Sequence, residues 1–365
     1  MYRIGIDAHA IGERLTGNET YIANIIEGLS RVETGHQFVL FLSSQDEATK
    51  LKLKYPHMET AITRPSWPFV RIPLVMPYVA RKKKIDILHV QYVGPPFTHI
   101  AKVVSIHDIS YEIYPKFFSK KELLQFKATI PMTARTSEKI ITISECSKKD
   151  LINIYGLPEE KIVVTYLGVS DRFKPYQEDD QSSEILKQYG INGRYVLAVG
   201  NLQPRKNLVR LIDAYTRLRN DRPDLNQKLV IVGKKAWKTS PILDFARETA
   251  WADDILFTGY VEEKHLPVIY SQADVFVYPS IYEGFGLPPL EAMACGTPVV
   301  VSDRASLPEV VGAAGIKVNP YDVESLAAAV ATVLLEPDIS EKLSRASIDR
   351  ASTFTWANCV EKTLS

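Results

Sequence analysis

The chain has 365 residues, more than one typical hydrophobic core accommodates, so we expect two domains. A hydrophobic content of 45%, a charged content of 24% and a formal net charge of +1 fit a soluble globular protein and exclude a global field that would recruit nucleic acid or membrane. The three cysteines lack metal-ligand spacing, no apolar run approaches the ~20 residues of a membrane helix, and no signal peptide begins the chain. We therefore predict a cytoplasmic protein with no metal site, with a peripheral position at the inner membrane face left open.

The first half alternates short apolar runs with amphipathic helical stretches. The predicted strands are 2–7, 38–42, 85–90, 102–106, 139–143 and 162–165. The predicted helices are 19–29, about 120–137 and 148–155. Because the strands are apolar throughout, they suit a parallel sheet that is buried on both faces.

The second half repeats the pattern after a polar stretch at 171–188, which we interpret as a linker. The predicted strands are 195–199, 228–232, 255–258, 274–278, 299–301 and 315–318. The predicted helices are 208–219, 241–251, 266–272, 290–295 and 325–335. The expected fold is α/β, with two doubly wound domains at 1–170 and 189–351 that face one another across a cleft. We expect a C-terminal helix around 352–365 to pack back on the first domain.

The stretch from Pro279 to Val301 combines a strand end, a glycine turn and a helix start. Pro288 and Pro289 suit the first turn of the helix. Such a turn directs backbone N–H groups and the positive end of the helix dipole at an anion such as phosphate. Two carboxylates, Glu283 and Glu291, bracket the turn, and because carboxylates repel phosphate we expect them to hold hydroxyl groups.

Ligands of doubly wound sheets bind at the carboxyl ends of the strands, so the residues that follow strands are candidate site residues. Arg205 and Lys206 follow Gly200 and precede a helix. Cations at a helix N-terminus interact unfavourably with the helix dipole, and this cost in free energy suggests that a ligand such as a diphosphate compensates for it. His107 follows another strand and could bind a substrate or carry a proton; the alternative is a structural histidine that neighbouring backbone satisfies. Gly17 opens the first helix. The segments 233–237 and 259–266 could contact a nucleobase or could be routine turns.

These motifs, taken together and in order, resemble the retaining glycosyltransferases of family 4, which have the GT-B fold of two Rossmann-like domains. The motifs that carry the resemblance are the spacing from Glu283 to Glu291 within EGFGLPPLEAMACGTPVV, then VGNLQPRKN, ITISECSKKDL, the His107–Asp108 pair, SDRASLPEVVG and FTW. One departure is that many members carry paired glycines in the first loop, where this chain reads TGNET.

The resemblance implies transfer of a sugar, with retention, from a nucleoside-diphosphate sugar of the UDP-glucose or GDP-mannose type to a glycan or lipid-linked acceptor. By the resemblance, Arg205 and Lys206 neutralise the departing diphosphate, and Glu283 holds hydroxyls of the transferred sugar. His107 lies near that sugar, and Glu291 holds the ribose hydroxyls. The remaining implied donor contacts are Gly17, Gly200, Val261, Gly284, Phe285, Gly286 and Leu287. No metal or other cofactor is expected.

The first loop also resembles a subset of the family that acts on surface or envelope polysaccharides. Two further stretches, 66–84 and 114–127, mix aromatic with basic residues and could lie against anionic lipid; the alternative is a core-packed loop followed by a solvated charge run. The alternative functions are a sugar-nucleotide 2-epimerase on the same fold and a sugar-nucleotide-binding protein without transfer. A nicotinamide dehydrogenase is disfavoured because the chain lacks its glycine fingerprint.

Overall fold

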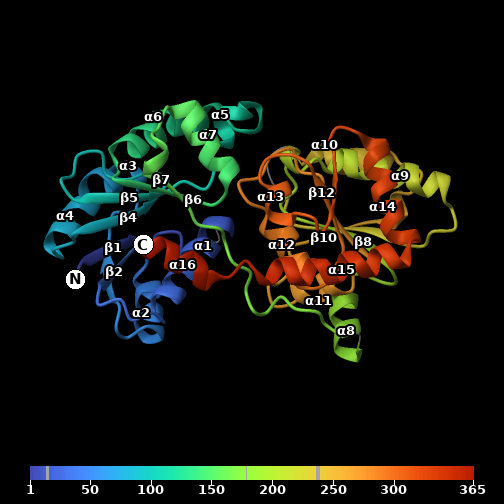
Figure 1. Ribbon diagram of the computed structural model, residues 1–365, viewed down its shortest axis with the longest axis horizontal. Helices are drawn as coiled ribbons and strands as arrows, with labels where there is room; N and C mark the ends of the chain where they lie inside the picture. Colours follow the sequence, from blue (N-terminus) through green and yellow to red (C-terminus); the bar gives the residue numbers. More distant parts are fainter. Residues whose placement is uncertain (14–15, 178, 236–238) are drawn as a thin grey trace. The chain divides into compact units, whose positions relative to one another are not determined.

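The computed structural model describes residues 1–13, 16–177, 179–235 and 239–365. The chain divides into two compact units, residues 1–168 with 356–365 and residues 169–355 (Figure 1). The segment 171–188 lies in the second unit and ends in helix α8 (Asp180–Gln188). Trp237, in one of the segments considered for nucleobase contact, lies outside the described residues.

The first unit contains, among its described residues, a parallel sheet of seven strands in the order β3-β2-β1-β4-β5-β6-β7. The strands are β1 (Arg3–Asp7), β2 (Gln37–Leu42), β3 (Glu59–Ile62), β4 (Ile87–Gln91), β5 (Ala101–Ser105), β6 (Lys139–Thr142) and β7 (Ile162–Val164). In the register of the central strands, His89 lies beside Ile6 and Gln91 lies beside Ser105.

Helices cover both faces of this sheet (Figure 1). The main ones are α1 (Thr16–Leu29), α2 (Gln45–Lys54), α4 (Met76–Lys82), α6 (Lys120–Thr136), α7 (Glu145–Tyr155) and α16 (Trp356–Leu364). The face that holds Leu88 and Val90 packs against α4, α6 and α7. On the other face α1 packs against α16, and Gly28 allows this close approach, because a Cβ there would lie 2.3 Å from Val360.

Several elements of the first unit were not predicted from the sequence. The strand β3 is a short edge strand, which gives little apolar signal. The helix α2 is mostly polar, although Ser44 caps its N-terminus. The segment 68–82 forms α3 (Pro68–Val70), the π-helical turn η1 (Arg71–Val75) and α4, and its three prolines conceal the helical pattern. Shorter helical turns are α5 (Ser110–Ile113), η2 (Pro115–Phe117) and η3 (Glu159–Lys161).

The second unit contains, in its described part, a parallel sheet of six strands in the order β10-β9-β8-β11-β12-β13. The strands are β8 (Tyr195–Val199), β9 (Lys228–Val232), β10 (Ile255–Gly259), β11 (Val275–Tyr278), β12 (Val299–Ser302) and β13 (Ile316–Val318). The other helices are η4 (Pro204–Lys206), α9 (Leu208–Asp221), α10 (Ser240–Glu248), η5 (Ala252–Asp254), α11 (Leu266–Ser271), α12 (Leu287–Ala294), α13 (Leu307–Val311), α14 (Val323–Leu335) and α15 (Pro337–Ser352). The predicted α/β fold with two doubly wound parallel sheets is therefore confirmed.

The strand order of each sheet reverses once, between β1 and β4 in the first unit and between β8 and β11 in the second. At such a switch point the loops that follow the two strands diverge to opposite faces and leave a space at the carboxyl ends, where ligands of this architecture bind. The loops begin at Ala8 and Tyr92 in the first unit and at Gly200 and Pro279 in the second. The two switch points are thus the places to search for a site.

Candidate active site

The switch point of the second unit brings together two segments that are about seventy residues apart. Arg205 and Lys206 lie in the turn η4 after β8, directly before α9, as the sequence predicts. Asn207 ends this turn in a left-handed conformation with φ of 60°. Its side-chain amide donates to the carbonyl of Pro279, 3.1 Å away, and so fastens the turn to the loop after β11.

Arg205, Lys206 and Glu283 form an ion trio in which Glu283 is buried and the two cations are partly buried. The Nη1 of Arg205 lies 2.8 Å from Oε2 of Glu283, and the Nζ of Lys206 lies 2.8 Å from Oε1 of the same carboxylate. Nη1 of Arg205 also donates to the carbonyl of Tyr282. Glu283 thus neutralises one of the two positive charges and offsets part of the local cost of placing cations before a helix.

Glu283 is ionised at neutral pH. Burial opposes its ionisation, but the charges of Arg205 and Lys206 outweigh that effect and lower the pKa of Glu283 to about 2. Two cations and one anion leave the trio with a net charge of +1. The site therefore has its cations held in place by an internal carboxylate and still attracts an anion.

Two residues that the sequence analysis missed hold this trio. The hydroxyl of Ser280 donates to Oε1 of Glu283, and Nζ of Lys206 donates to the hydroxyl of Tyr278. Nζ of Lys206 also lies 4.6 Å from the centre of the Tyr278 ring. Tyr278 is the last residue of β11. An aromatic residue in a buried strand is usually part of the hydrophobic core, so the sequence gives little reason to choose Tyr278 as a site residue.

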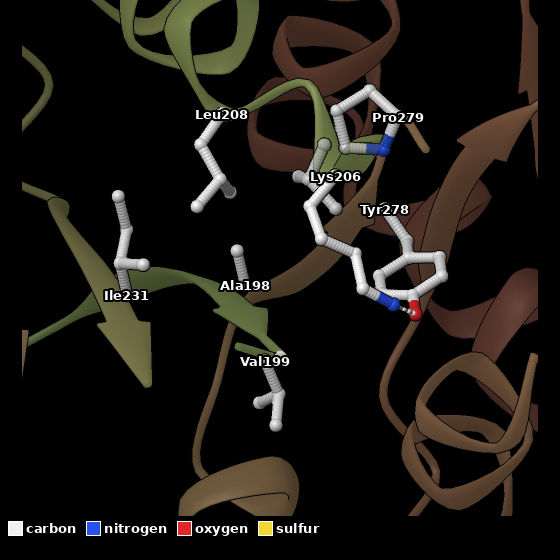
Figure 2. Close-up of a pocket in the computed structure, with 9 residues that line it drawn as sticks. Ala198, Val199, Lys206, Leu208, Ile231, Tyr278 and Pro279 are labelled. Atoms are coloured by element: carbon white, nitrogen blue, oxygen red, sulfur yellow. Dashed lines mark hydrogen bonds between the residues drawn. The ribbon is translucent and has the colours of Figure 1, made fainter. Parts of the chain in front are cut away.

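A small pocket lined by Lys206 and Tyr278 adjoins the trio (Figure 2). Figure 2 shows the Lys206 side chain reaching past Pro279 to the hydroxyl of Tyr278, with Ala198, Leu208 and Ile231 around the apolar part of the pocket. The amine of Lys206 is therefore directed along one wall by its bond to Tyr278.

The glycine turn after Glu283 follows the sequence prediction, although α12 begins at Leu287 and ends at Ala294 instead of spanning 290–295. Gly286 has a φ of 112°, and a Cβ there would lie 2.7 Å from Leu307. The Phe285 ring is buried against Phe354, so Phe285 faces the core and contributes to a ligand site through its backbone. The turn is held by Ser306, whose hydroxyl donates to the carbonyls of Glu283, 2.8 Å away, and Phe285, 2.7 Å away.

The prolines of α12 change which backbone groups this helix can offer. Pro288 and Pro289 lack N–H groups. The second and third residues of this helix therefore have no N–H group to direct at an anion. The anion site expected at this helix start remains a prediction.

Glu291 lies one turn into α12 and accepts a hydrogen bond from the Tyr270 hydroxyl on α11, with 2.9 Å between the oxygens. Burial raises the pKa of Glu291 to about 7, and the bond from Tyr270 and the charge of Arg172 offset part of that effect. The two carboxylates that bracket the turn therefore differ: Glu283 is permanently charged, whereas Glu291 titrates near neutrality.

Two glycines bring the ends of β8 and β9 together. A Cβ on Gly233 would lie 2.0 Å from the carbonyl oxygen of Gly200, so no side chain fits there. A Cβ on Gly200 would lie 3.3 Å from Cε of Lys206. Gly200 thus gives room to the lysine side chain. Val261 is buried in the turn that follows β10.

The remaining two predicted site residues belong to the first unit. Gly17 is exposed near the start of α1 and has open space around its Cα. His107 follows β5 and is buried, with its ring 4.5 Å from that of Tyr21 and 5.4 Å from that of Tyr92. Burial lowers the pKa of His107 to about 4, although Asp108 acts in the opposite direction, so the imidazole is neutral at pH 7. A hydrogen-bonding role therefore fits the structure better than proton transfer near neutral pH.

Within the described ranges, no cluster of three or more histidine, cysteine, aspartate or glutamate side chains is placed to hold a metal ion. Among the same residues, no helix has the length and apolar character needed to cross a bilayer.

Comparison with known proteins identifies the family. Residues 181–350 match the glycosyl transferases group 1, and residues 15–173 match glycosyltransferase family 4. The O-antigen chain mannosyltransferase B of Escherichia coli is 33% identical over 72% of this chain and 69% of its own length. The serotype-specific mannosyltransferase WbdA of Escherichia coli is 29% identical over 61% of this chain, a match that spans 28% of that longer protein.

A solved structure agrees on the fold. Alr3699/HepE of Anabaena, in complex with UDP and glucose, superimposes with a TM-score of 0.78 at 18% identity and is covered over 98% of its length by 100% of this chain. At this identity the likeness shows the fold alone. The family matches and the mannosyltransferase relatives together show that this chain belongs to the family 4 (group 1) glycosyltransferases of the GT-B fold and is a glycosyltransferase.

Proposed function

We propose that this glycosyltransferase moves a mannosyl unit from a nucleoside-diphosphate mannose to a hydroxyl of a growing or lipid-linked glycan, in the synthesis of a surface polysaccharide. The observation that carries the proposal is the ion trio at the switch point, where Arg205 and Lys206 are fixed and a net positive charge remains. The names of the relatives support mannose and a surface polysaccharide, since one is an O-antigen chain mannosyltransferase. UDP and GDP remain the candidate nucleotides of the donor.

In the proposed reaction, negative charge develops on the diphosphate as the glycosidic bond to the sugar breaks. Preorganised cations at that position stabilise the transition state, by about 3 kcal/mol for one well-directed donor. Arg205 and Lys206 supply those donors, and because Glu283 and Tyr278 already hold them, little reorganisation is needed at the moment of reaction.

The two carboxylates have separate tasks in this proposal. Glu283 orients the cations through its contacts with Arg205 and Lys206, and the remaining lone pairs of its carboxylate hold hydroxyls of the transferred sugar. We do not assign it as a nucleophile. Glu291 accepts the ribose hydroxyls. We propose a front-face route with retention, in which the departing phosphate helps to deprotonate the acceptor. His107 offers a neutral imidazole to a sugar hydroxyl.

The proposed charge stabilisation by Arg205 and Lys206 removes the need for a divalent metal. Transfer is therefore expected to continue at an undiminished rate in excess chelator. A rate that falls with chelator and returns on adding Mg²⁺ or Mn²⁺ would contradict this part of the proposal.

The experiment for the main proposal is incubation of the full chain with UDP- and GDP-linked mannose and glucose, with and without mannose-terminated oligosaccharide acceptors. The expected result is transfer from one of the mannose donors, with an α-linked product from an α-linked donor by NMR. Interconversion of donor sugars without acceptor would favour a 2-epimerase. Donor binding without product on any acceptor would favour a binding protein.

We also propose that the first unit contacts anionic lipid through the segment 66–84. Trp67 and Phe69 are 72% and 74% exposed, and Leu74 and Tyr78 project from the following turns into solvent. Exposed basic side chains continue the surface at Arg81, Lys82 and Lys84. Exposed aromatic residues beside cations suit a lipid interface, because the rings enter the headgroup region and the cations face anionic lipid.

The second stretch considered for membrane contact, 114–127, is partly core. Phe118 and Phe126 pack against the buried Tyr111, with ring centres 6.3 and 5.4 Å from it. Flotation with phosphatidylglycerol and phosphatidylcholine vesicles tests the proposal. We expect salt-sensitive binding to the anionic vesicles that is lost when Trp67 and Phe69 are replaced by serine. Equal binding of the wild type and that variant would refute contact through 66–84.

A further inference from the structure

The switch point of the first unit, between β1 and β4, carries polar side chains of its own. Asp7, at the end of β1, is saturated: Nη1 and Nη2 of the buried Arg71 donate to its two oxygens at 2.8 and 3.1 Å. This pair lies on the α4 side of the sheet. The charge of Arg71 is therefore neutralised by Asp7 within the fold.

Gln91, the last residue of β4, is different. It lies beside Ser105 in the register and is 5% exposed. Both its Oε1 and its Nε2 are buried, and neither has a hydrogen-bond partner among the described residues. An unmade hydrogen bond of a buried polar group is expensive, by roughly 1–3 kcal/mol for each group. Such a side chain is suited to a ligand that both donates and accepts hydrogen bonds.

His107 presents a second unpartnered group on the same face of the sheet. It is 7% exposed, and its Nε2 is buried without a hydrogen-bond partner in the part of the chain that the structure describes. The neighbouring Ser105 does not supply the missing hydrogen bond of either side chain. The Ser105 hydroxyl is engaged by His89 Nε2 and by the Tyr21 hydroxyl, each 2.8 Å away.

The backbone between these residues is also unusual. Tyr92, directly after Gln91, has a φ of 56°, in the left-handed region that aromatic residues rarely adopt. Its N–H donates to the carbonyl of Ser105 at 2.9 Å, and its ring lies 5.4 Å from that of His107. Strained residues of this kind concentrate at functional sites, because the surrounding structure must hold them there.

We propose that Gln91 is a specificity-determining contact to a hydroxyl group of the saccharide acceptor. The proposal rests on the proposed function. The amide supplies one acceptor and two donors, which match a sugar hydroxyl or a pair of neighbouring hydroxyls. The uncharged amide and neutral imidazole suit an uncharged polyol, whereas the cations that suit a diphosphate lie at the switch point of the second unit. We therefore assign the acceptor hydroxyl to Gln91 and the donor diphosphate to the cations of the second unit.

The test compares Gln91→Leu and Gln91→Glu with the control Gln227→Leu. Gln227 is also a buried glutamine with an unpartnered Oε1, but it precedes β9, at the amino end of the sheet. The readouts are the KM for a mannose-terminated oligosaccharide, the KM for the donor, and the thermal unfolding midpoint. Saturation-transfer NMR with methyl α-mannoside measures saccharide binding without any transfer.

For Gln91→Leu we expect the acceptor KM to rise about tenfold or more, the donor KM to stay within twofold, and the saccharide NMR signal to be lost, with no fall in the unfolding midpoint. Gln91→Glu retains an acceptor oxygen and should give an intermediate KM. Gln227→Leu should leave both KM values unchanged. An unchanged acceptor KM and NMR signal in Gln91→Leu, a change confined to the donor KM, or no saccharide signal from the wild type would overturn the proposal.

The same experiment separates this inference from the proposed function. If the wild type binds methyl α-mannoside through Gln91 but transfers no sugar, the proposed function fails and the saccharide contact stands. If the wild type transfers mannose but Gln91→Leu has wild-type acceptor kinetics, the proposed function stands and the inference fails.

Discussion

The two switch points of this protein differ in charge and in hydrogen bonding, although both lie at the centre of a doubly wound parallel sheet. In the second unit, Arg205, Lys206 and Glu283 satisfy one another and leave one positive charge. In the first unit, Gln91 and His107 are neutral and have buried atoms without partners among the described residues. The same topology can thus present a net positive cluster in one sheet and uncharged polar side chains in the other, and the residues at the strand ends decide which.

The largest expected effect comes from breaking the ion trio. We expect Arg205→Ala or Lys206→Ala to lower kcat by about 10²–10³-fold, because each removes a preorganised donor to the leaving diphosphate. The measurement is steady-state transfer at saturating acceptor. Arg217→Ala is the matched control, since Arg217 lies on α9 nearby in sequence but pairs with Asp213 on the exposed side of the helix. Wild-type turnover in both trio variants would remove these residues from the reaction.

The next effect concerns the pH dependence of stability. The pKa of Glu291 is about 7 in the folded protein and about 4.5 in the unfolded chain. The folded value is the higher one, so this group contributes fully to stability below pH 4.5 and the contribution is lost as the pH rises through 7. Glu291→Gln should therefore gain about 2 kcal/mol of unfolding free energy relative to wild type between pH 5 and pH 8, less than the full shift implies because water partly screens the side chain.

Urea denaturation of both proteins at the two pH values tests this. A difference in unfolding free energy that is the same at pH 5 and pH 8 would show that Glu291 does not titrate in this range. The same variant should bind donor more weakly, whereas Glu283→Gln should mainly slow transfer.

A smaller effect is expected from Tyr278→Phe, which removes the hydroxyl that accepts a hydrogen bond from Lys206 and keeps the ring. Loss of one such bond corresponds to about 1 kcal/mol, so kcat should fall roughly five- to tenfold while donor KM changes little. Phe276→Leu, which alters packing beside the same ring, serves as the control. A kcat reduction in the control as large as that of Tyr278→Phe would indicate a packing effect instead of an effect on Lys206.

The smallest expected effect lies on the surface of the first unit. Replacing Trp67 and Phe69 by serine should change unfolding free energy by less than about 0.5 kcal/mol per residue, because both side chains are exposed. Thermal unfolding of the variant checks this. A loss of several kcal/mol would mean that these rings pack against the fold and are not available to a membrane.

Much of this architecture could be predicted from the sequence because buried parallel strands are continuous apolar runs. Tyr195–Val199 and Lys228–Val232 were predicted with the bounds that the structure has. The short edge strand β3 and the proline-rich segment 68–82 lack that signal, so they could not be found in this way.

The positions of Arg205 and Lys206 after a strand, and of Glu283 beside the glycine turn, could be predicted from the sequence. Their mutual pairing could not, since it depends on the turn that Asn207 makes toward Pro279. Tyr278 and Gln91 could not be selected because a buried strand residue shows its polar contacts, or the lack of them, only once the fold is known.

The most direct test of the central claim, that the second switch point binds the nucleoside diphosphate through fixed cations, is calorimetric titration with UDP and GDP. The wild type should bind one of the two nucleotides, and the double variant Arg205→Ala, Lys206→Ala should bind it at least 100-fold more weakly, with Gln91→Leu unchanged. Equal nucleotide affinity in the wild type and the double variant would contradict the account.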